Sequence, residues 1–150
     1  MNTRIILITV VTMLTYSAST RAADPVAKAK ELFDRYIALE HAFDAAAADL
    51  YSDDAKIQNT RTYPTGDKRT LTMPASDYKK LIRGALPLAK ARGDTSTYSD
   101  IKYTPEGDRV RITCTRFSEL KKYSSPMSLL VGPDKDGKWL IFEEISESQP

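Results

Sequence analysis

The order of two hydrophobic periodicities along the chain restricts its fold more than any other feature. Up to about residue 51, and again after residue 77, apolar residues recur every three or four positions, as on one face of a helix. After residue 98, alternating segments separated by turn-forming residues are typical of strands. Helices followed by strands predict an α+β fold, with the helices packed on one face of an antiparallel sheet.

Three helices are expected from these patterns. The first begins at Asp24-Pro25, because aspartate is a good N-cap and proline suits the first helical position. The second covers roughly residues 42–51. The third is capped by Ser76, begins near Asp77 and ends at Gly93-Asp94.

Six strands are expected, at residues 55–62, 69–73, 98–103, 109–120, 124–132 and 138–145. Turns rich in proline, glycine and aspartate separate most of them. Alternation places Ile57, Asn59 and Arg61 on one face of the first strand. A register error of one residue would exchange the inner and outer sets of any strand.

The first 22 residues differ in character from the rest of the chain. Arg4 precedes an almost wholly apolar run over residues 5–14, and small residues lead up to Ala22. This layout is typical of a secretory signal peptide, and the run is shorter than the roughly 20 residues of a membrane-spanning helix. We expect cleavage after Ala22, which leaves one domain over residues 23–150, exported to the periplasm or secreted. An uncleaved anchor is the alternative.

The net charge limits the possible partners, and the cysteine content limits the possible disulfides. Without Arg4 and Arg21 the formal net charge of +2 falls to zero, which offers no general field for nucleic acid or for an anionic membrane. We therefore expect no nucleic-acid partner, and no membrane span after cleavage. The one cysteine, Cys114, excludes an internal disulfide and is expected to fill space in the core.

Two short segments resemble the nuclear-transport-factor-2-like superfamily, in its ketosteroid isomerase and polyketide cyclase branch. The sequence Leu-Tyr-Ser-Asp-Asp-Ala at residues 50–55 resembles the helix-to-strand junction of that superfamily, and Asp-Gly-Lys-Trp-Leu-Ile at residues 136–141 resembles its last hairpin. The resemblance covers essentially all of residues 23–150. It implies a cone-shaped fold, in which a curved sheet wraps around three helices and leaves a pocket at its open end.

The isomerase branch also implies positions for individual site residues. Tyr36 matches the tyrosine that donates a hydrogen bond to a developing oxyanion, and Ser128 replaces a second donor. Asn59 stands where the branch has its general base, and an amide cannot accept a proton at neutral pH. The resemblance therefore implies no catalytic residue, and a ligand-binding set of Tyr36, Asn59, Arg61 and Ser128.

Other chemistries find little support in the sequence. His41, the only histidine, is expected to have a cationic or hydrogen-bonding role at the end of the first helix. An epoxide-hydrolase-like site could draw on Arg61 or Arg116, but no pair of aspartates can be matched to either. Metal-binding and phosphate-binding motifs are missing, so no metal or cofactor is expected.

The sequence leaves three functions open. The first is an exported pocket domain that binds a small apolar or amphipathic molecule without catalysis. The second is an interaction module of the cell envelope, for example a homodimer formed through the sheet face that carries Arg111, Thr113 and Thr115. The third is a hydrolase or lyase of the polyketide-cyclase type, which would need an inward carboxylate close to Tyr36 or Arg61.

Overall fold

The computed structural model describes residues 24–150, so the predicted signal peptide lies outside the described residues. The elements in chain order are α1 (Pro25–Ala42), the 3₁₀ helix η1 (Ala45–Leu50), β1 (Tyr51–Thr62), β2 (Lys68–Pro74), α2 (Ala75–Arg92), β3 (Ser96–Glu106), β4 (Arg109–Ser118), β5 (Tyr123–Pro133) and β6 (Trp139–Ser148). The strands form one sheet in the order β2-β1-β6-β5-β4-β3. None of the helices in this part of the chain is both long and apolar enough to cross a membrane.

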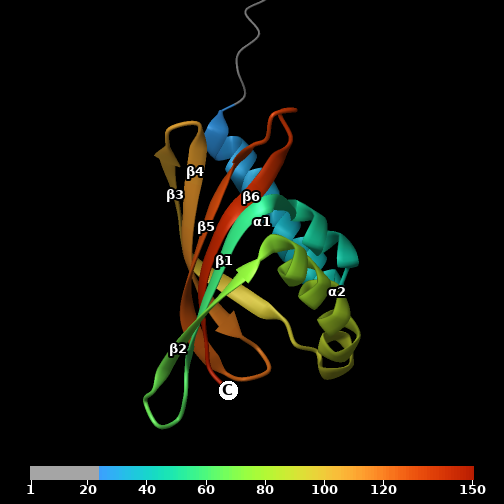
Figure 1. Cartoon of the computed structure of the whole chain (residues 1–150), viewed down its shortest axis with the longest axis vertical. Coiled ribbons are helices and arrows are strands. Elements are labelled where there is room, and N and C mark those ends of the chain that lie inside the picture. The colour runs from blue at the N-terminus through green and yellow to red at the C-terminus, as the bar shows by residue number, and fades with distance from the viewer. Residues whose placement is uncertain (1–23) are drawn as a thin grey trace, which may run out of the picture.

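The predicted α+β architecture is confirmed. Figure 1 shows a strongly twisted sheet with α1 and α2 on the same side of it. Neighbouring strands are antiparallel with one exception, because β1 lies parallel to β6 and makes the sheet mixed. Periodicity along each strand could not predict this pair, since it joins segments more than eighty residues apart.

The helix ends follow local chemistry. Asp24 accepts a hydrogen bond from the Val26 backbone at 3.0 Å, as expected of an N-cap, and Phe43 ends α1 in the left-handed conformation. The second helix is a short 3₁₀ segment capped by Asp44. The predicted cap at Ser76 is wrong, because α2 begins at Ala75 and has no side-chain cap.

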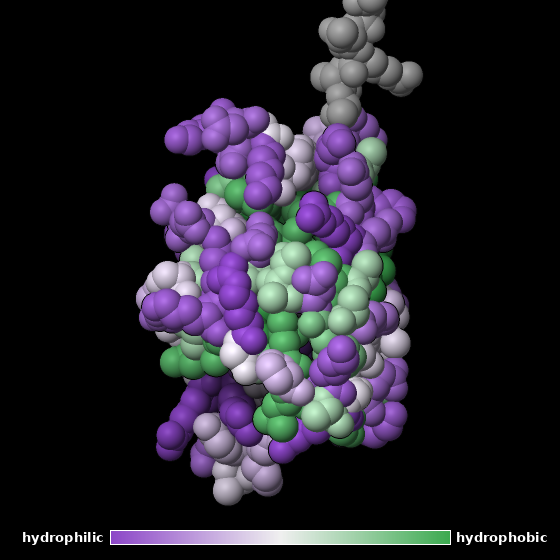
Figure 2. All heavy atoms as spheres, turned by 90° about the vertical axis from the view of Figure 1, so that its right-hand side faces the viewer, coloured by the Kyte–Doolittle hydropathy of each residue, from purple (hydrophilic) through white to green (hydrophobic). Residues whose placement is uncertain are grey.

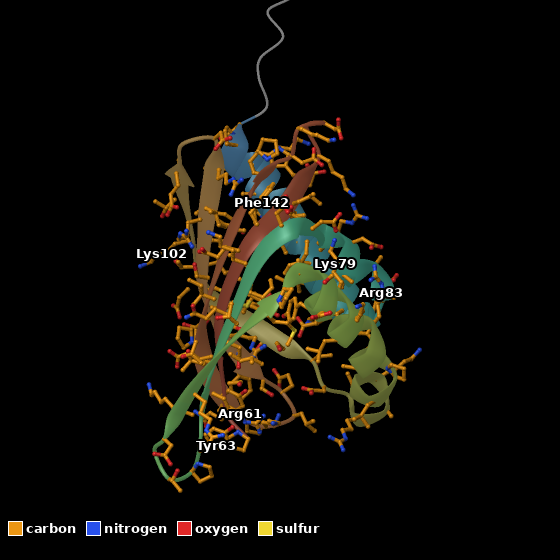
Figure 3. All side chains as sticks on the ribbon, in the orientation of Figure 1. Arg61, Tyr63, Lys79, Arg83, Lys102 and Phe142 are labelled. Carbon is orange, nitrogen blue, oxygen red and sulfur yellow. The ribbon has the colours of Figure 1, made fainter. Side chains whose placement is uncertain are left out.

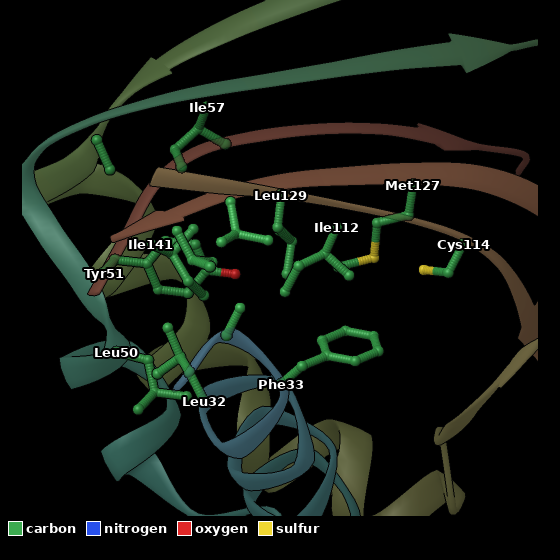
Figure 4. Packing of buried hydrophobic residues seen from close by; sticks show 14 of the residues in the cluster. Leu32, Phe33, Leu50, Tyr51, Ile57, Ile112, Cys114, Met127, Leu129 and Ile141 are labelled. Carbon is green, nitrogen blue, oxygen red and sulfur yellow. The ribbon is translucent and has the colours of Figure 1, made fainter. Parts of the chain in front are cut away.

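The core lies between α1 and the concave face of the sheet. Ala29, Leu32 and Phe33 of α1 are buried against alternate residues of β4, β5 and β6. In Figure 4 the Phe33 ring faces Ile112, Met127 and Cys114. Burial of such apolar side chains stabilises the fold by roughly 1.5–3 kcal/mol each.

Helix α2 packs much less closely than α1. Ala75 is its one fully buried residue, whereas Leu81 and Leu88 are 54% and 56% exposed. Figure 2 shows apolar side chains at the surface on this side of the molecule, among hydrophilic ones. The loose packing of α2 leaves room between the helix and the inner face of the sheet.

Candidate ligand pocket

A pocket of about 290 Å³ opens between α2, the β1–β2 hairpin and the inner face of the sheet. Its lining has an apolar part and a polar part, which are called here the apolar wall and the polar wall. The apolar wall consists of Ile57, Leu71, Met73 and Leu81, and the polar wall consists of Asn59, Tyr78, Arg116, Glu144, Ser146 and Ser148. The volume is at the lower end of the range for small-molecule sites, and the mixture of walls is typical of them.

Glu144 is the buried carboxylate of this pocket. It is 4% exposed, and both of its oxygens accept hydrogen bonds. The Tyr51 hydroxyl donates to Oε2 at 2.5 Å, and the Tyr78 hydroxyl donates to Oε1 at 3.0 Å. The two tyrosines come from β1 and α2, so Glu144 ties both elements to β6.

The two tyrosines keep their protons over the physiological range. Burial raises the pKa of both hydroxyls well above the usual value, and the neighbouring Glu144 raises it further. Each hydroxyl therefore remains a donor to the carboxylate. Their rings meet edge to face with centroids 5.3 Å apart, which fixes the position of both donors.

A β-bulge at Phe142 turns Glu144 into the interior. Val131 pairs with Ile141 but Leu130 pairs with Glu143, so Phe142 has no partner on β5. Simple alternation from Ile141 would have placed Glu143 inside and Glu144 outside. The sequence analysis did not single out Glu144, and no signal in the sequence marks the bulge.

Asn59 lies in the pocket, as predicted. Its Nδ2 donates to the Ser146 hydroxyl at 3.0 Å, and its Oδ1 accepts from the Ser148 hydroxyl at 2.8 Å. The parallel pairing of β1 with β6 brings these groups together. The side chain that faces the hollow at this position is therefore a neutral amide held in a fixed orientation.

Tyr36 and Arg61 lie outside the pocket. Tyr36 stacks on Phe33 and meets Tyr98 edge to face, so its ring belongs to the core between α1 and β3. Arg61 is exposed near the tip of the β1–β2 hairpin, beside the Tyr63 ring (Figure 3). It shares the inner face with Asn59, but it lies nearer the tip of the hairpin and does not line the pocket.

Ser128 lies on the opposite face of the sheet. Met127 and Leu129 of β5 point into the core, so Ser128 between them points outward and accepts a hydrogen bond from Arg111 at 3.1 Å. The predicted set of four ligand-binding residues is therefore not brought together, and Asn59 alone of the four lines the pocket. The resemblance misplaced Ser128 by one position in the alternation of β5.

His41 and Cys114, which were also considered from the sequence, have structural roles. His41 Nε2 donates to the Ser96 carbonyl at 2.7 Å and thereby fixes the end of α1 to the start of β3, which confirms the predicted hydrogen-bonding role. Cys114 is buried in the core, where burial raises the pKa of its thiol to about 11. Within residues 24–150 no cluster of three or more histidine, cysteine or acidic side chains is placed to hold a metal ion.

Solved structures resemble this fold at low sequence identity. An NTF2-like protein with a cystatin-like fold from Novosphingobium aromaticivorans has a TM-score of 0.58 and 18% identity, over 82% of this chain and 80% of that one. A candidate ketosteroid isomerase from Shewanella frigidimarina has a TM-score of 0.58 and 19% identity, over 79% and 93%. A Catenulispora acidiphila protein in complex with S-DNPA has a TM-score of 0.52 and 15% identity, over 81% and 90%.

The sequence matches no protein-family model and no curated relative. At these identities the solved structures identify a fold and leave the activity open. The similarity covers most of the described chain, with its six-stranded sheet and its helices. The chain has the nuclear-transport-factor-2-like fold.

Proposed function

We propose that this protein is an exported domain that binds a small amphipathic molecule in the pocket beneath α2. The observation that carries the proposal is the division of the pocket into an apolar and a polar wall. Apolar groups of a ligand would lie against Leu71, Met73 and Leu81, and its polar groups would face Asn59 and the inner strands. Export is proposed from residues 1–22, and N-terminal sequencing of the exported protein should find Ala23 first.

The polar wall supports binding rather than turnover. Asn59 replaces the base that the isomerase resemblance implies, and its amide is already held by two serines. Both oxygens of Glu144 accept tyrosine hydroxyls, so neither is left without a donor. These groups are suited to fixing a ligand in one orientation.

The apolar wall can be tested with a pair of matched variants of α2. Leu81 lines the pocket and Leu88 does not, although both are about half exposed. The amphipathic dye 8-anilinonaphthalene-1-sulfonate is the probe, followed by its fluorescence. We expect Leu81→Gln to weaken dye binding at least fivefold and Leu88→Gln to leave it unchanged.

The polar wall has a matched pair as well. Asn59→Ala should weaken binding of the same dye, whereas Ser128→Ala, on the outer face, should have no effect. Thermal unfolding of each variant checks that the fold is kept. If all four variants bound the dye as tightly as the wild-type protein, the dye would not be bound in this pocket.

Glu144 favours an acid–base enzyme as a second candidate, because it supplies the inward carboxylate that sequence reasoning could not find. In such an enzyme Glu144 would exchange a proton with a bound substrate, and Tyr51 and Tyr78 would hold the carboxylate. Its hydrogen-bond partners are not Tyr36 or Arg61, where the hydrolase or lyase hypothesis required a carboxylate. If the Glu144→Gln variant still bound a substrate but no longer converted it, that result would support the enzyme candidate.

A further inference from the structure

Arg116 is a positive charge in the pocket that lacks an ion-pair partner. It projects from β4 into the polar wall and is only partly exposed. Among residues 24–150, no carboxylate lies within salt-bridge distance of its guanidinium. Its one hydrogen bond is weak, from Nη2 to the Glu147 carbonyl at 3.5 Å.

A second unpaired polar group lies directly beside Arg116. Ser125 is the cross-strand neighbour of Arg116 on β5, and paired residues of antiparallel strands point to the same face. Its side chain is buried at 6% exposure. Arg116 Nε and Ser125 Oγ are the two buried side-chain polar atoms that have no hydrogen-bond partner in the described part of the chain.

The unpaired Arg116 guanidinium is suited to binding a group of opposite charge that enters the pocket. Buried polar groups in native proteins are nearly always hydrogen-bonded, and an unpaired buried charge is costly. Guanidinium N–H groups and a serine O–H are all donors to an oxyanion, and a carboxylate offers two oxygens to meet them. The carboxylate already in the pocket, Glu144, is held by Tyr51 and Tyr78 instead.

We propose that the ligand of this pocket carries a carboxylate group, bound by the Arg116 guanidinium. This inference rests on the proposed binding function and names the class of ligand. The apolar body of the acid would lie against Leu71, Met73 and Leu81, which line the same pocket as Arg116. The ligand is thus a small apolar carboxylic acid, such as a short aryl-alkanoic acid.

The test compares two probes that differ only at their polar end, 4-phenylbutyrate and 4-phenylbutanol, by calorimetric titration of the full chain. We expect the acid to bind at least tenfold more tightly than the alcohol. Arg116→Met should abolish this preference, because the affinity for the acid falls to about that for the alcohol. Arg116→Lys should keep part of it, because an ammonium retains the charge without the planar pair of donors.

Arg61→Met is the matched control, because it removes the same charge from an exposed site outside the pocket. It should leave the preference for the acid intact. Equal affinity for acid and alcohol, or an unchanged preference in Arg116→Met, would overturn the carboxylate assignment and leave the pocket proposal standing. Binding of neither probe at millimolar concentration would contradict both. Thermal unfolding of each variant ensures that only folded proteins are compared, and Arg116→Lys is the milder alternative to Arg116→Met.

Discussion

The hydroxyl group of the single residue Tyr51 should make a measurable contribution to the free energy of unfolding. Tyr51→Phe keeps the ring in place and leaves Glu144 Oε2 without its donor at 2.5 Å. Loss of one hydrogen bond to a buried carboxylate costs about 1–3 kcal/mol. We expect Tyr51→Phe to lower the free energy of unfolding by that amount, as measured by urea denaturation.

Tyr63→Phe is the matched control for this exchange. The Tyr63 ring lies beside Arg61 and Arg69 at the β1–β2 hairpin, remote from Glu144. The same loss of one oxygen there should change stability by less than about 0.5 kcal/mol. Equal losses in the two variants would show that the Tyr51–Glu144 hydrogen bond contributes nothing to stability.

The sequence analysis named Asn59 and Arg116, which both line the pocket, and missed the carboxylate. Asn59 was predictable because the alternation in β1 runs without interruption from Ile57 onward. Ser128 was misplaced because its partners on β4 and β6 fix which face it takes, and the chain alone does not specify them. Glu144 could not be predicted, since the bulge at Phe142 reverses the alternation just before it.

At the scale of elements, α2 carries a glycine where an alanine would serve better. Gly84 lies inside the helix, and a Cβ built on it meets no atom within 4 Å. Glycine in a helix interior costs roughly 0.5–1 kcal/mol relative to alanine. Gly84→Ala should therefore raise the free energy of unfolding by about that amount.

Replacing Gly93 by alanine should have the opposite effect on the free energy of unfolding. It ends α2 with a φ of +62°, a conformation that alanine adopts only at a cost of roughly 1–2 kcal/mol. Gly93→Ala should lower stability although its Cβ also meets open space. If both variants shifted the thermal midpoint in the same direction, helix propensity would not be what decides the stability of α2.

The helices and strands were largely predictable because their signals are local. Asp24-Pro25 marks the start of α1, and Gly93 marks the end of α2. The parallel pairing of β1 with β6 was not predictable, because it depends on how distant parts of the chain fold onto each other. Local patterns likewise could not tell that the second helix would be a 3₁₀ segment of six residues.

At the scale of the whole molecule, the outer sheet face has polar networks of its own. Arg111 pairs with Glu106 and Glu143, and Ile145 beside this network is 40% exposed. A homodimer through this face, the second function considered from sequence, stays a prediction. Light scattering measures the oligomeric state directly.

Four tyrosines, of which Tyr51 is buried and the others are partly buried, connect the helices to the sheet. Tyr51 and Tyr78 hold Glu144, while Tyr98 of β3 donates to Glu40 of α1 at 2.5 Å and meets the Tyr36 ring edge to face. Burial is the main cause that raises the pKa of all four hydroxyls. The native fold therefore depends on these groups remaining protonated.

This dependence predicts that alkali will unfold the protein. The unfolded chain releases tyrosine protons near pH 10, whereas the folded chain retains them to higher pH, so stability is fully present below pH 10 and falls above it. Each retained proton contributes a slope of about 1.4 kcal/mol per pH unit. Urea denaturation between pH 8 and pH 11 measures the slope, and tyrosinate absorbance should rise in step with unfolding. Tyr98→Phe should make the decline shallower and Tyr63→Phe should not, whereas a flat profile to pH 11 would show that the four hydroxyls do not hold the fold together.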